Sequence, residues 1–109
     1  MKLGIKNKIR MLCVKQDIAV LKQALKEEDC LAVDLRDKED FDFFHIEGTV
    51  NIPYSSDIIN GIKRYVKNKN AKIYLFCYHG ANAKAVCAML RTKGYTNAVN
   101  LGGIDKWKR

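Results

Sequence analysis

Cys77 lies at a place in the sequence where a thiol could become a nucleophile. It comes directly after the apolar residues 73–76, which are typical of a strand buried on both faces, and a helical pattern starts at residue 82. The intervening turn is tight, and Gly80 gives it the backbone freedom that it needs. Successive backbone N–H groups of such a turn can face an anion, and the start of the helix adds partial positive charge. Both effects stabilise a thiolate, which is the nucleophilic form of cysteine.

The other cysteines and His45 are expected to have structural roles. Cys87 falls on the apolar face of the helical pattern, and Cys13 and Cys30 lack any loop context. His45 is expected to pack against its neighbours and to bond to the backbone. A cysteine that ends a strand is itself more often an inert core residue than a nucleophile, so the loop alone does not assign a role to Cys77.

Length and composition fit one globular domain. The chain has 109 residues, of which 48% are hydrophobic and 29% charged, so an unassisted core is feasible and disorder is excluded. No two of its four cysteines have C-x-x-C spacing, and the two histidines are not placed to complete a zinc site. No apolar run reaches the length of a signal-peptide core or a membrane span. We therefore expect free thiols in a cytoplasmic protein, with no membrane span and no structural metal or disulfide.

The formal net charge of +8 indicates a basic surface that attracts anions. Lys and Arg are scattered, with modest clusters at residues 2–10, 63–69 and 106–109 and without an evident series of aromatic platforms for bases. The pattern therefore does not favour a nucleic acid as the partner. Residues 1–10 are expected to form a basic N-terminal extension, and residues 11–109 are expected to form the domain.

The segments that must position Cys77 alternate between strand-like and helical patterns. Strands are expected over residues 11–14, 31–35, 49–52, 73–76 and 98–101. Helices are expected over residues 17–28, 38–44, 58–67 and 82–93. This alternation predicts an α/β fold, a single domain with a five-stranded, mostly parallel sheet and helices on both faces. Ligands of such sheets bind beyond the carboxyl ends of the strands, which is where Cys77 lies.

Two sets of motifs resemble the signatures of the rhodanese family. The first contains Asp34-Leu35-Arg36, Phe41 and the run from His45 to Pro53, His-Ile-Glu-Gly-Thr-Val-Asn-Ile-Pro. The second contains Cys77-Tyr78-His79-Gly80, Gly94-Tyr95, Leu101-Gly102-Gly103-Ile104 and Trp107. The motifs occur in the order and at the spacing of that family, and they span residues 14–109. The loop after Cys77 is particularly similar to that of short single-domain thiosulfate sulfurtransferases of the bacterial cytoplasm.

The resemblance implies a single rhodanese-like domain and a double-displacement reaction at Cys77. The thiolate would take the outer sulfur of a small anionic donor such as thiosulfate, or of a persulfide, and would pass it to cyanide, a thiol or a protein acceptor. Neither a cofactor nor a metal is implied, and a monomer and a weak homodimer are both consistent with the reaction. Asp34 is expected to approach the site. The residues expected to hold the terminal sulfur of the persulfide are Tyr78, His79, Gly80, Ala81 and Asn82.

The sequence departs from the family pattern around this site. Asn82 and Ala83 stand where the family often has Arg or Ser and then Ser, so the backbone must hold the anion with few side-chain donors. Asp40 stands where family members that handle thiosulfate well can carry a basic residue, and Phe44 replaces the usual glycine. These differences bear on which donor is used more than on the chemistry.

Charged residues close to the motifs are expected to fall into two groups. Arg36 should be held in an internal ion pair, with Glu47 as the candidate partner. His79 and Lys84 could add positive charge near the thiol if their side chains turn toward it.

Three alternatives stay open at this point. A cysteine phosphatase of related architecture would need a Cys-x5-Arg loop whose guanidinium grips phosphate, but the sixth residue after Cys77 is Ala83. A non-enzymatic binding or regulatory module of the same fold usually lacks the cysteine, which is present here. A persulfide carrier would receive sulfur from a partner protein and react slowly with thiosulfate, and the basic surface and few side-chain donors are compatible with that role.

Overall fold

A parallel β-sheet forms the centre of the structure, a computed structural model that describes residues 18–27 and 29–107. Its strands are β1 (Cys30–Asp34), β2 (Val50–Asn51), β3 (Lys72–Cys77) and β4 (Ala98–Gly103), in the order β2-β1-β3-β4. Each neighbouring pair is parallel, so the predicted α/β fold is confirmed. The described residues contain four strands instead of five. The strand predicted over residues 11–14 and the predicted extension 1–10 lie outside the described residues.

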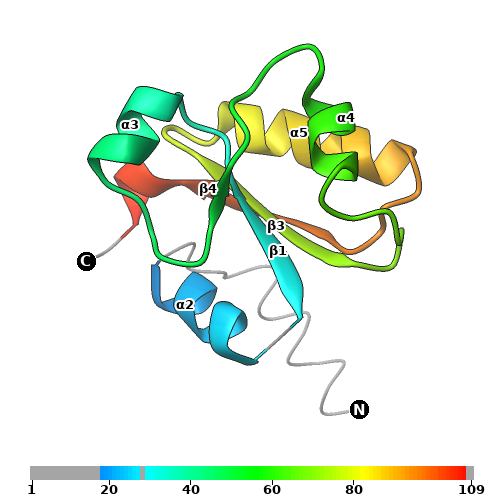
Figure 1. Cartoon of the computed structure of the whole chain (residues 1–109), viewed down its shortest axis with the longest axis horizontal. Coiled ribbons are helices and arrows are strands. Elements are labelled where there is room, and N and C mark those ends of the chain that lie inside the picture. Colours follow the sequence, from blue (N-terminus) through cyan, green and yellow to red (C-terminus); the bar gives the residue numbers. More distant parts are fainter. Residues whose placement is uncertain (1–17, 28, 108–109) are drawn as a thin grey trace.

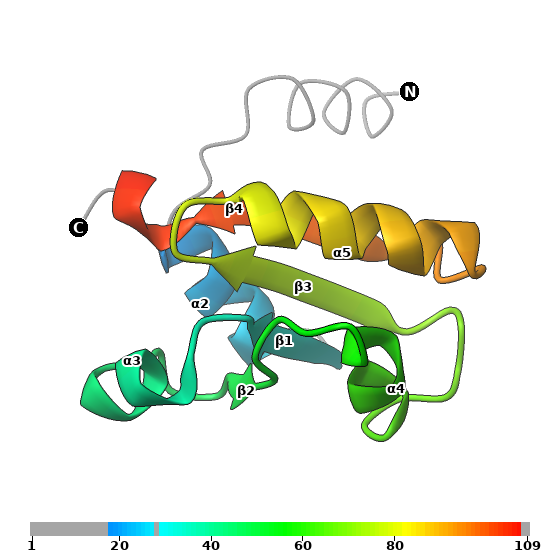
Figure 2. The ribbon, with the colours of Figure 1, turned by 90° about the horizontal axis from the view of Figure 1, so that it is seen from above.

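Helices cover both faces of this sheet (Figure 1). Helix α2 (Ile18–Glu27) packs on one face, and α4 (Ile58–Lys63) and α5 (Ala81–Thr92) pack on the other. Figure 2 shows α5 running along β3 and β4. Helix α3 (Lys38–Phe43) follows the carboxyl end of β1, and a 3₁₀ turn, η1 (Ile104–Lys106), follows β4 directly.

Strand β3 separates two hydrophobic cores. Its side chains alternate, so that Ile73, Leu75 and Cys77 belong to the core under α4 and α5. Tyr74 and Phe76 belong to the core under α2. All five are buried, as expected for a continuous apolar strand in a parallel sheet. Because of this alternation, the Cys77 side chain lies on the sheet face that α5 covers.

The order of the strands creates a crevice between β1 and β3. After β1 the chain moves to β2 on one side, and it then crosses to β3 on the other side of β1. The segments that leave the carboxyl ends of β1 and β3 therefore diverge, and ligands of open α/β sheets bind at such a point. In this chain those segments are residues 35–37 and 78–80.

The boundary of α4 differs from the sequence prediction. The helix ends at Lys63 rather than at residue 67, because the chain turns there and the N–H groups of Tyr65 and Val66 both bond to the carbonyl oxygen of Ile62. Val66 still packs against the core, which explains why the apolar residues of this segment keep a helical spacing beyond the end of the helix.

Candidate active site

A cavity of about 430 Å³ opens at the carboxyl ends of β1 and β3. The segment after β1 and the start of α3 form one wall, and the loop after β3 and the start of α5 form the other. Tyr54 completes the lining, because its N–H bonds to the carbonyl oxygen of Leu35 at 3.1 Å. The lining residues are Leu35, Arg36, Asp37, Asp40, Tyr54, Cys77, Tyr78, His79, Ala81 and Asn82.

Cys77 lies on the inner surface of this cavity, with only 4% of the residue exposed. Its Sγ accepts hydrogen bonds from the backbone N–H of Gly80 at 3.0 Å and from that of Ala83 at 3.4 Å. Amide donors that converge on one atom form a site for an anion. We call residues 77–83 the thiol loop.

Three further N–H groups of the thiol loop are available to a ligand. No described residue accepts a hydrogen bond from the backbone N–H of His79, Ala81 or Asn82, and all three residues line the cavity. The first N–H groups of a helix have no partner within it and carry partial positive charge, which applies to Ala81 and Asn82 at the start of α5. The loop can therefore hold an anion attached to Cys77 through its backbone.

Contacts on the outer side of the thiol loop fix the direction of its amides. The carbonyl oxygen of Tyr78 accepts a hydrogen bond from the N–H of Asp105 at 3.1 Å. The carbonyl oxygen of His79 accepts one from Nζ of Lys106 at 2.8 Å. In a trans peptide the C=O and N–H groups point in opposite directions. Lys106 therefore holds the His79–Gly80 peptide with its N–H turned inward, toward Sγ.

Two glycines allow the loop to close against β4. Gly80 has a φ of 110°, in the left-handed region that residues with side chains rarely adopt. Gly103 pairs with Cys77 in the sheet, and a Cβ atom there would lie 2.3 Å from the backbone carbon of His79. Only glycine fits at this position. Gly103 belongs to one of the sequence motifs, but no local pattern in the sequence indicates that two backbones meet there.

A buried ion pair lies behind the opposite wall. Nη2 of Arg36 lies 2.9 Å from Oδ2 of Asp34 and Nε lies 3.0 Å from Oδ1, while Nη2 also donates to the carbonyl oxygen of Phe44 at 2.6 Å. Arg36 lines the cavity, whereas Asp34 is fully buried and does not. The expected internal ion pair of Arg36 is present, but Glu47 as its partner is wrong. Glu47 is exposed, whereas the guanidinium of Arg36 folds back onto the carboxylate of Asp34, two residues earlier in the chain.

His79 and Lys84 do not bring positive charge to the sulfur. Nδ1 of His79 lies 2.8 Å from Oδ2 of Asp105, so its ring is turned toward η1, and Lys84 does not line the cavity. The hydrogen bond from His79, with a smaller contribution from the charge of Lys106, holds the pKa of Asp105 below its ordinary value. Among the described residues, the groups that donate hydrogen bonds to the Cys77 sulfur are therefore backbone N–H groups and not a side-chain cation.

Among the described residues, neither Cys30, Cys87 nor His45 lines the cavity. Cys87 is buried in the core, Cys30 is partly buried, and Cys13 lies outside the described residues. His45 has the backbone contact that was expected, with Nδ1 2.8 Å from the carbonyl oxygen of Phe41, and it stacks on the ring of that residue while staying exposed.

The described part of the chain shows no sign of a metal site, a membrane span or a phosphate-gripping loop. Within residues 18–27 and 29–107, no three His, Cys, Asp or Glu side chains are grouped so that they could hold a metal ion. No helix in these ranges combines the length and the apolar character of a membrane span. The thiol loop ends in Ala83, so it lacks the guanidinium with which a related loop would grip phosphate.

Five lining residues are absent from the predicted site: Leu35, Arg36 and Asp40, which the sequence interpretation mentions without a contact to the ligand, and Asp37 and Tyr54, which it does not mention individually. The positions of the last two are informative. Each follows the last residue of a strand by three positions, Asp34 of β1 and Asn51 of β2. Because the carboxyl ends of parallel strands gather at one edge of a sheet, the predicted strands contained the signal for both. Lys106 had no such signal, since it lies 27 residues from the carbonyl group that it binds.

Comparison with known proteins finds relatives that match most of the chain. The family model of the rhodanese-like domain matches residues 17–109. Thiosulfate sulfurtransferase GlpE of Pseudomonas fluorescens is 28% identical over 89 residues, which cover 79% of this chain and 77% of that protein. The protein of the same name from Pseudomonas syringae is 30% identical over 87 residues, which cover 79% of each chain.

Solved structures are similar to this chain as well. The solution structure of the rhodanese-like domain of the Anabaena protein Alr3790 has a TM-score of 0.70 at 26% identity, covering 84% of this chain and 70% of that one. The crystal structure of a rhodanese-like domain protein from Staphylococcus aureus has a TM-score of 0.61 at 29% identity, covering 81% and 84%. The similarity therefore extends from the sequence to the arrangement of the sheet and helices.

Replacing Gly103 by alanine should displace the thiol loop. The new Cβ meets backbone atoms of His79 that no rotamer change can move. We expect the free energy of unfolding to fall by about 1–3 kcal/mol and the amide NMR signals of the thiol loop to shift. Gly61→Ala is the matched control, because its Cβ would meet only the side-chain Cγ2 of Ile52, at 3.0 Å. Unchanged loop signals in Gly103→Ala would contradict the close approach.

The His79–Asp105 contact should make stability depend on pH in the acid range. The pKa of Asp105 is lower in the folded chain than its ordinary value. The contact therefore stabilises the fold at pH values above that ordinary pKa, and this stabilisation is lost as the pH falls through the pKa of the folded state. We expect His79→Ala to raise the pKa of Asp105, measured from its carboxyl ¹³C shift against pH. His45→Ala, which removes a histidine bonded to the backbone, should leave it unchanged. If Asp105 has the same pKa in the parent and in His79→Ala, the hydrogen bond from His79 is not what lowers it.

Proposed function

The chain belongs to the rhodanese-like domain family, and we propose that it is a sulfurtransferase in which Cys77 carries the transferred sulfur as a persulfide. The donor is thiosulfate or a persulfide, and the acceptor is cyanide or a thiol, either free or on a protein. One observation carries the proposal: the Cys77 sulfur lines an open cavity and accepts hydrogen bonds from the backbone N–H groups of Gly80 and Ala83, at 3.0 and 3.4 Å. Such a sulfur has both access to a donor and a site for its anionic product.

The first half-reaction places a sulfur atom on Cys77. The thiolate attacks the outer sulfur of thiosulfate, a new S–S bond forms to Sγ, and the original S–S bond breaks with its electron pair leaving on sulfite. The Cys77 thiolate and the thiosulfate dianion become a persulfide anion and the sulfite dianion, so charge and electrons balance without a cofactor or metal. In the second half-reaction the acceptor attacks the outer sulfur, and Sγ leaves as a thiolate again.

The thiol loop is suited to hold the persulfide between these steps. The N–H groups of His79, Ala81 and Asn82 lack acceptors among the described residues and line the space into which the outer sulfur would project. Fixed dipoles of this kind stabilise charge without reorienting during a reaction. They also explain how the loop could work with Asn82 and Ala83 in place of charged or hydroxyl side chains.

A persulfide carrier that receives sulfur from a partner protein is the second candidate. It is favoured by the state of Arg36, whose guanidinium is bound to Asp34 and to a backbone carbonyl group. The described lining residues therefore offer no free guanidinium or ammonium group for the sulfonate end of thiosulfate. Nothing in the site favours a non-enzymatic module, because such a module would not need backbone N–H groups that point toward the Cys77 sulfur.

The proposal also defines the setting in which the protein works. Cys77 and Cys87 are free thiols, and a reducing compartment such as the cytoplasm would keep them so. A sulfur donor and a thiol acceptor are the partners that the reaction needs, and neither a membrane nor a nucleic acid takes part. One chain holds the complete thiol loop, so a monomer or a weak homodimer would serve equally.

Cys77→Ser should abolish sulfur transfer. Serine keeps the approximate size of the side chain but cannot form a persulfide. We expect thiosulfate:cyanide turnover to fall to background, and mass spectrometry to find the mass of one sulfur atom added to the parent and none added to the variant. Cys30→Ala is the control and should keep turnover within about twofold, because this partly buried thiol does not line the cavity.

Three results would change the assignment. Turnover that survives in Cys77→Ser would move the reaction to another group. Sulfur added to the parent by a persulfide donor protein, but not by thiosulfate, would favour the carrier. No added sulfur from either donor would favour the non-enzymatic module.

Lys106→Met should slow the reaction without removing the nucleophile. It deletes the hydrogen bond to His79 that turns the Gly80 N–H toward Sγ. The loss of one such bond corresponds to about 0.5–1.5 kcal/mol, or about a two- to tenfold fall in kcat/KM. Lys106→Arg should recover most of the loss. Lys93→Met, which removes an equal charge at the far end of α5, should have little effect, and equal losses in the two Met variants would refute the positioning role.

A further inference from the structure

The charges that line the cavity differ from the charge of the whole chain. The chain has a formal net charge of +8, whereas the lining residues with a formal charge are Arg36, Asp37 and Asp40. The two carboxylates stand at the start of α3 and are exposed. An acidic opening on a basic molecule selects by charge among the molecules that approach it.

Arg36 does not offset these two carboxylates. Its guanidinium contacts both carboxylate oxygens of the fully buried Asp34 at 2.9–3.2 Å and the carbonyl oxygen of Phe44 at 2.6 Å. A two-point pair of this kind is close to electrically neutral when seen from outside. Asp37 and Asp40 are therefore the uncompensated charges among the described lining residues.

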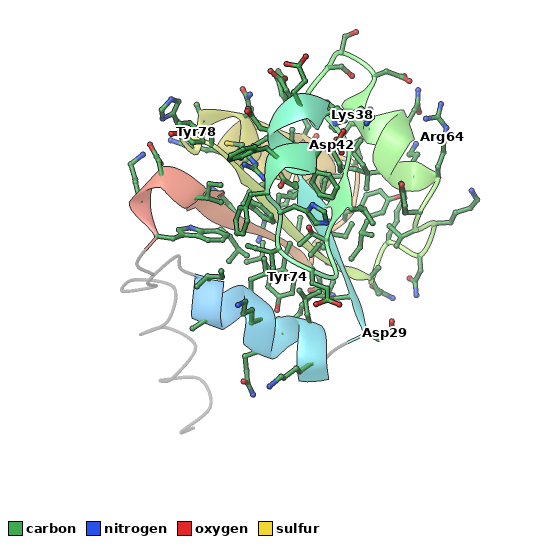
Figure 3. The ribbon with its side chains drawn as sticks, turned by 60° about the vertical axis from the view of Figure 1, so that its left-hand side comes forward. Asp29, Lys38, Asp42, Arg64, Tyr74 and Tyr78 are labelled. Carbon is green, nitrogen blue, oxygen red and sulfur yellow. The ribbon has the colours of Figure 1, made fainter. Side chains whose placement is uncertain are left out.

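Neighbouring cations are engaged elsewhere. On α3, Nζ of Lys38 lies 2.6 Å from Oδ2 of Asp42, and Figure 3 shows these two side chains together. Lys106 donates to the outer side of the thiol loop. Within the described part of the chain, neither Asp37 nor Asp40 forms an ion pair.

Two tyrosine rings share the cavity with these carboxylates. Tyr54 and Tyr78 are 43% and 50% exposed, and both line the cavity. Figure 3 shows Tyr78 at the outside of the molecule. The face of a tyrosine ring attracts cations, as a carboxylate does. An ammonium or guanidinium group is thus the ligand that these four side chains would bind together.

We propose that the cavity selects a sulfur acceptor that carries a positive charge close to its thiol. The inference rests on the proposed function, because it concerns the partner of the Cys77 persulfide. The shared chemistry is a thiol with an ammonium or guanidinium group beside it, found either in a small aminothiol or in a protein cysteine flanked by Lys or Arg. The same carboxylates repel the thiosulfate dianion.

The transfer to such an acceptor needs no further reactant. The acceptor thiolate attacks the outer sulfur of the persulfide, and a new S–S bond forms. The bond to Sγ breaks with its electron pair leaving on Sγ, so the acceptor becomes a persulfide anion and Cys77 becomes a thiolate. The cationic group of the acceptor is unchanged, and it lowers the repulsion between two sulfur anions and the nearby carboxylates.

The test uses three acceptors of similar size and different charge: cysteamine, 2-mercaptoethanol and mercaptoacetate. Cys77 is first converted to its persulfide with inorganic polysulfide, and sulfur loss to each acceptor is followed by mass spectrometry at equal thiolate concentration and low salt. We expect the parent to react faster with cysteamine than with mercaptoacetate, and Asp37→Asn/Asp40→Asn to reduce this rate ratio about three- to tenfold. The intrinsic reactivity of the thiols cancels, because the ratio is compared between two proteins.

Glu39→Gln is the matched control. Glu39 is an exposed acid on α3 that does not line the cavity, so its loss should leave the ratio as it is in the parent. A second measurement separates a charge effect from damage to the fold. The double variant Asp37→Asn/Asp40→Asn should use thiosulfate faster than the parent while it uses cysteamine more slowly, whereas a damaged fold would slow both reactions.

Each outcome decides the inference. An unchanged ratio in the double variant, or an equal change in Glu39→Gln, would overturn it and leave the sulfurtransferase proposal standing. Failure of polysulfide to add sulfur to Cys77 would overturn both.

Short peptides distinguish the two sources of the acceptor. One carries a cysteine between lysines, and its partner carries a cysteine between glutamates. Equal rates for the two peptides would also overturn the inference. Where the lysine peptide is the faster of the two, a rate above that of cysteamine indicates a protein acceptor, and a rate below it indicates a small aminothiol.

Discussion

The conformation of the thiol loop and of the strand beside it depends on one feature, the two backbone N–H groups that converge on the Cys77 sulfur. They belong to residues three and six positions after the cysteine, so the chain must reverse its direction within one short loop. That reversal requires Gly80 in the left-handed region, and it requires β4 to approach without a side chain at Gly103. Each of these conditions concerns the backbone. The chemistry of the loop is therefore fixed more by conformation than by the side chains that it displays.

The two walls of the cavity carry different kinds of charge. Backbone dipoles of the thiol loop face the sulfur, while carboxylates stand on the wall that follows β1. The guanidinium of Arg36 serves that second wall as a scaffold, because it is bound to Asp34 and to the backbone of Phe44. The side chain of Asn51 holds the same segment through the carbonyl oxygens of Asp34 and Arg36, at 3.0 and 2.9 Å. A strongly basic chain can in this way present an acidic opening.

Local patterns in the sequence predicted the parts of the fold that depend on local physics. The apolar run before Cys77 and the helical period after it located β3 and α5 to within one or two residues. Contacts between distant segments were beyond such patterns, as the reach of Lys106 to the loop shows. The partner of Arg36 was missed for a different reason, because charge alone cannot distinguish the exposed Glu47 from a carboxylate that is buried with the guanidinium. The strand over residues 11–14 stays a prediction.

The outer contacts of the thiol loop make its conformation depend on residues near the carboxyl end of the described chain. The groups that bind the carbonyl oxygens of Tyr78 and His79 belong to residues 105 and 106, and the glycine against which the loop closes is residue 103. A chain truncated after residue 100 would contain the cysteine but none of these supports. The end of β4 and η1 therefore form one structural unit with the thiol loop, although 27 residues separate His79 from Lys106 in the sequence.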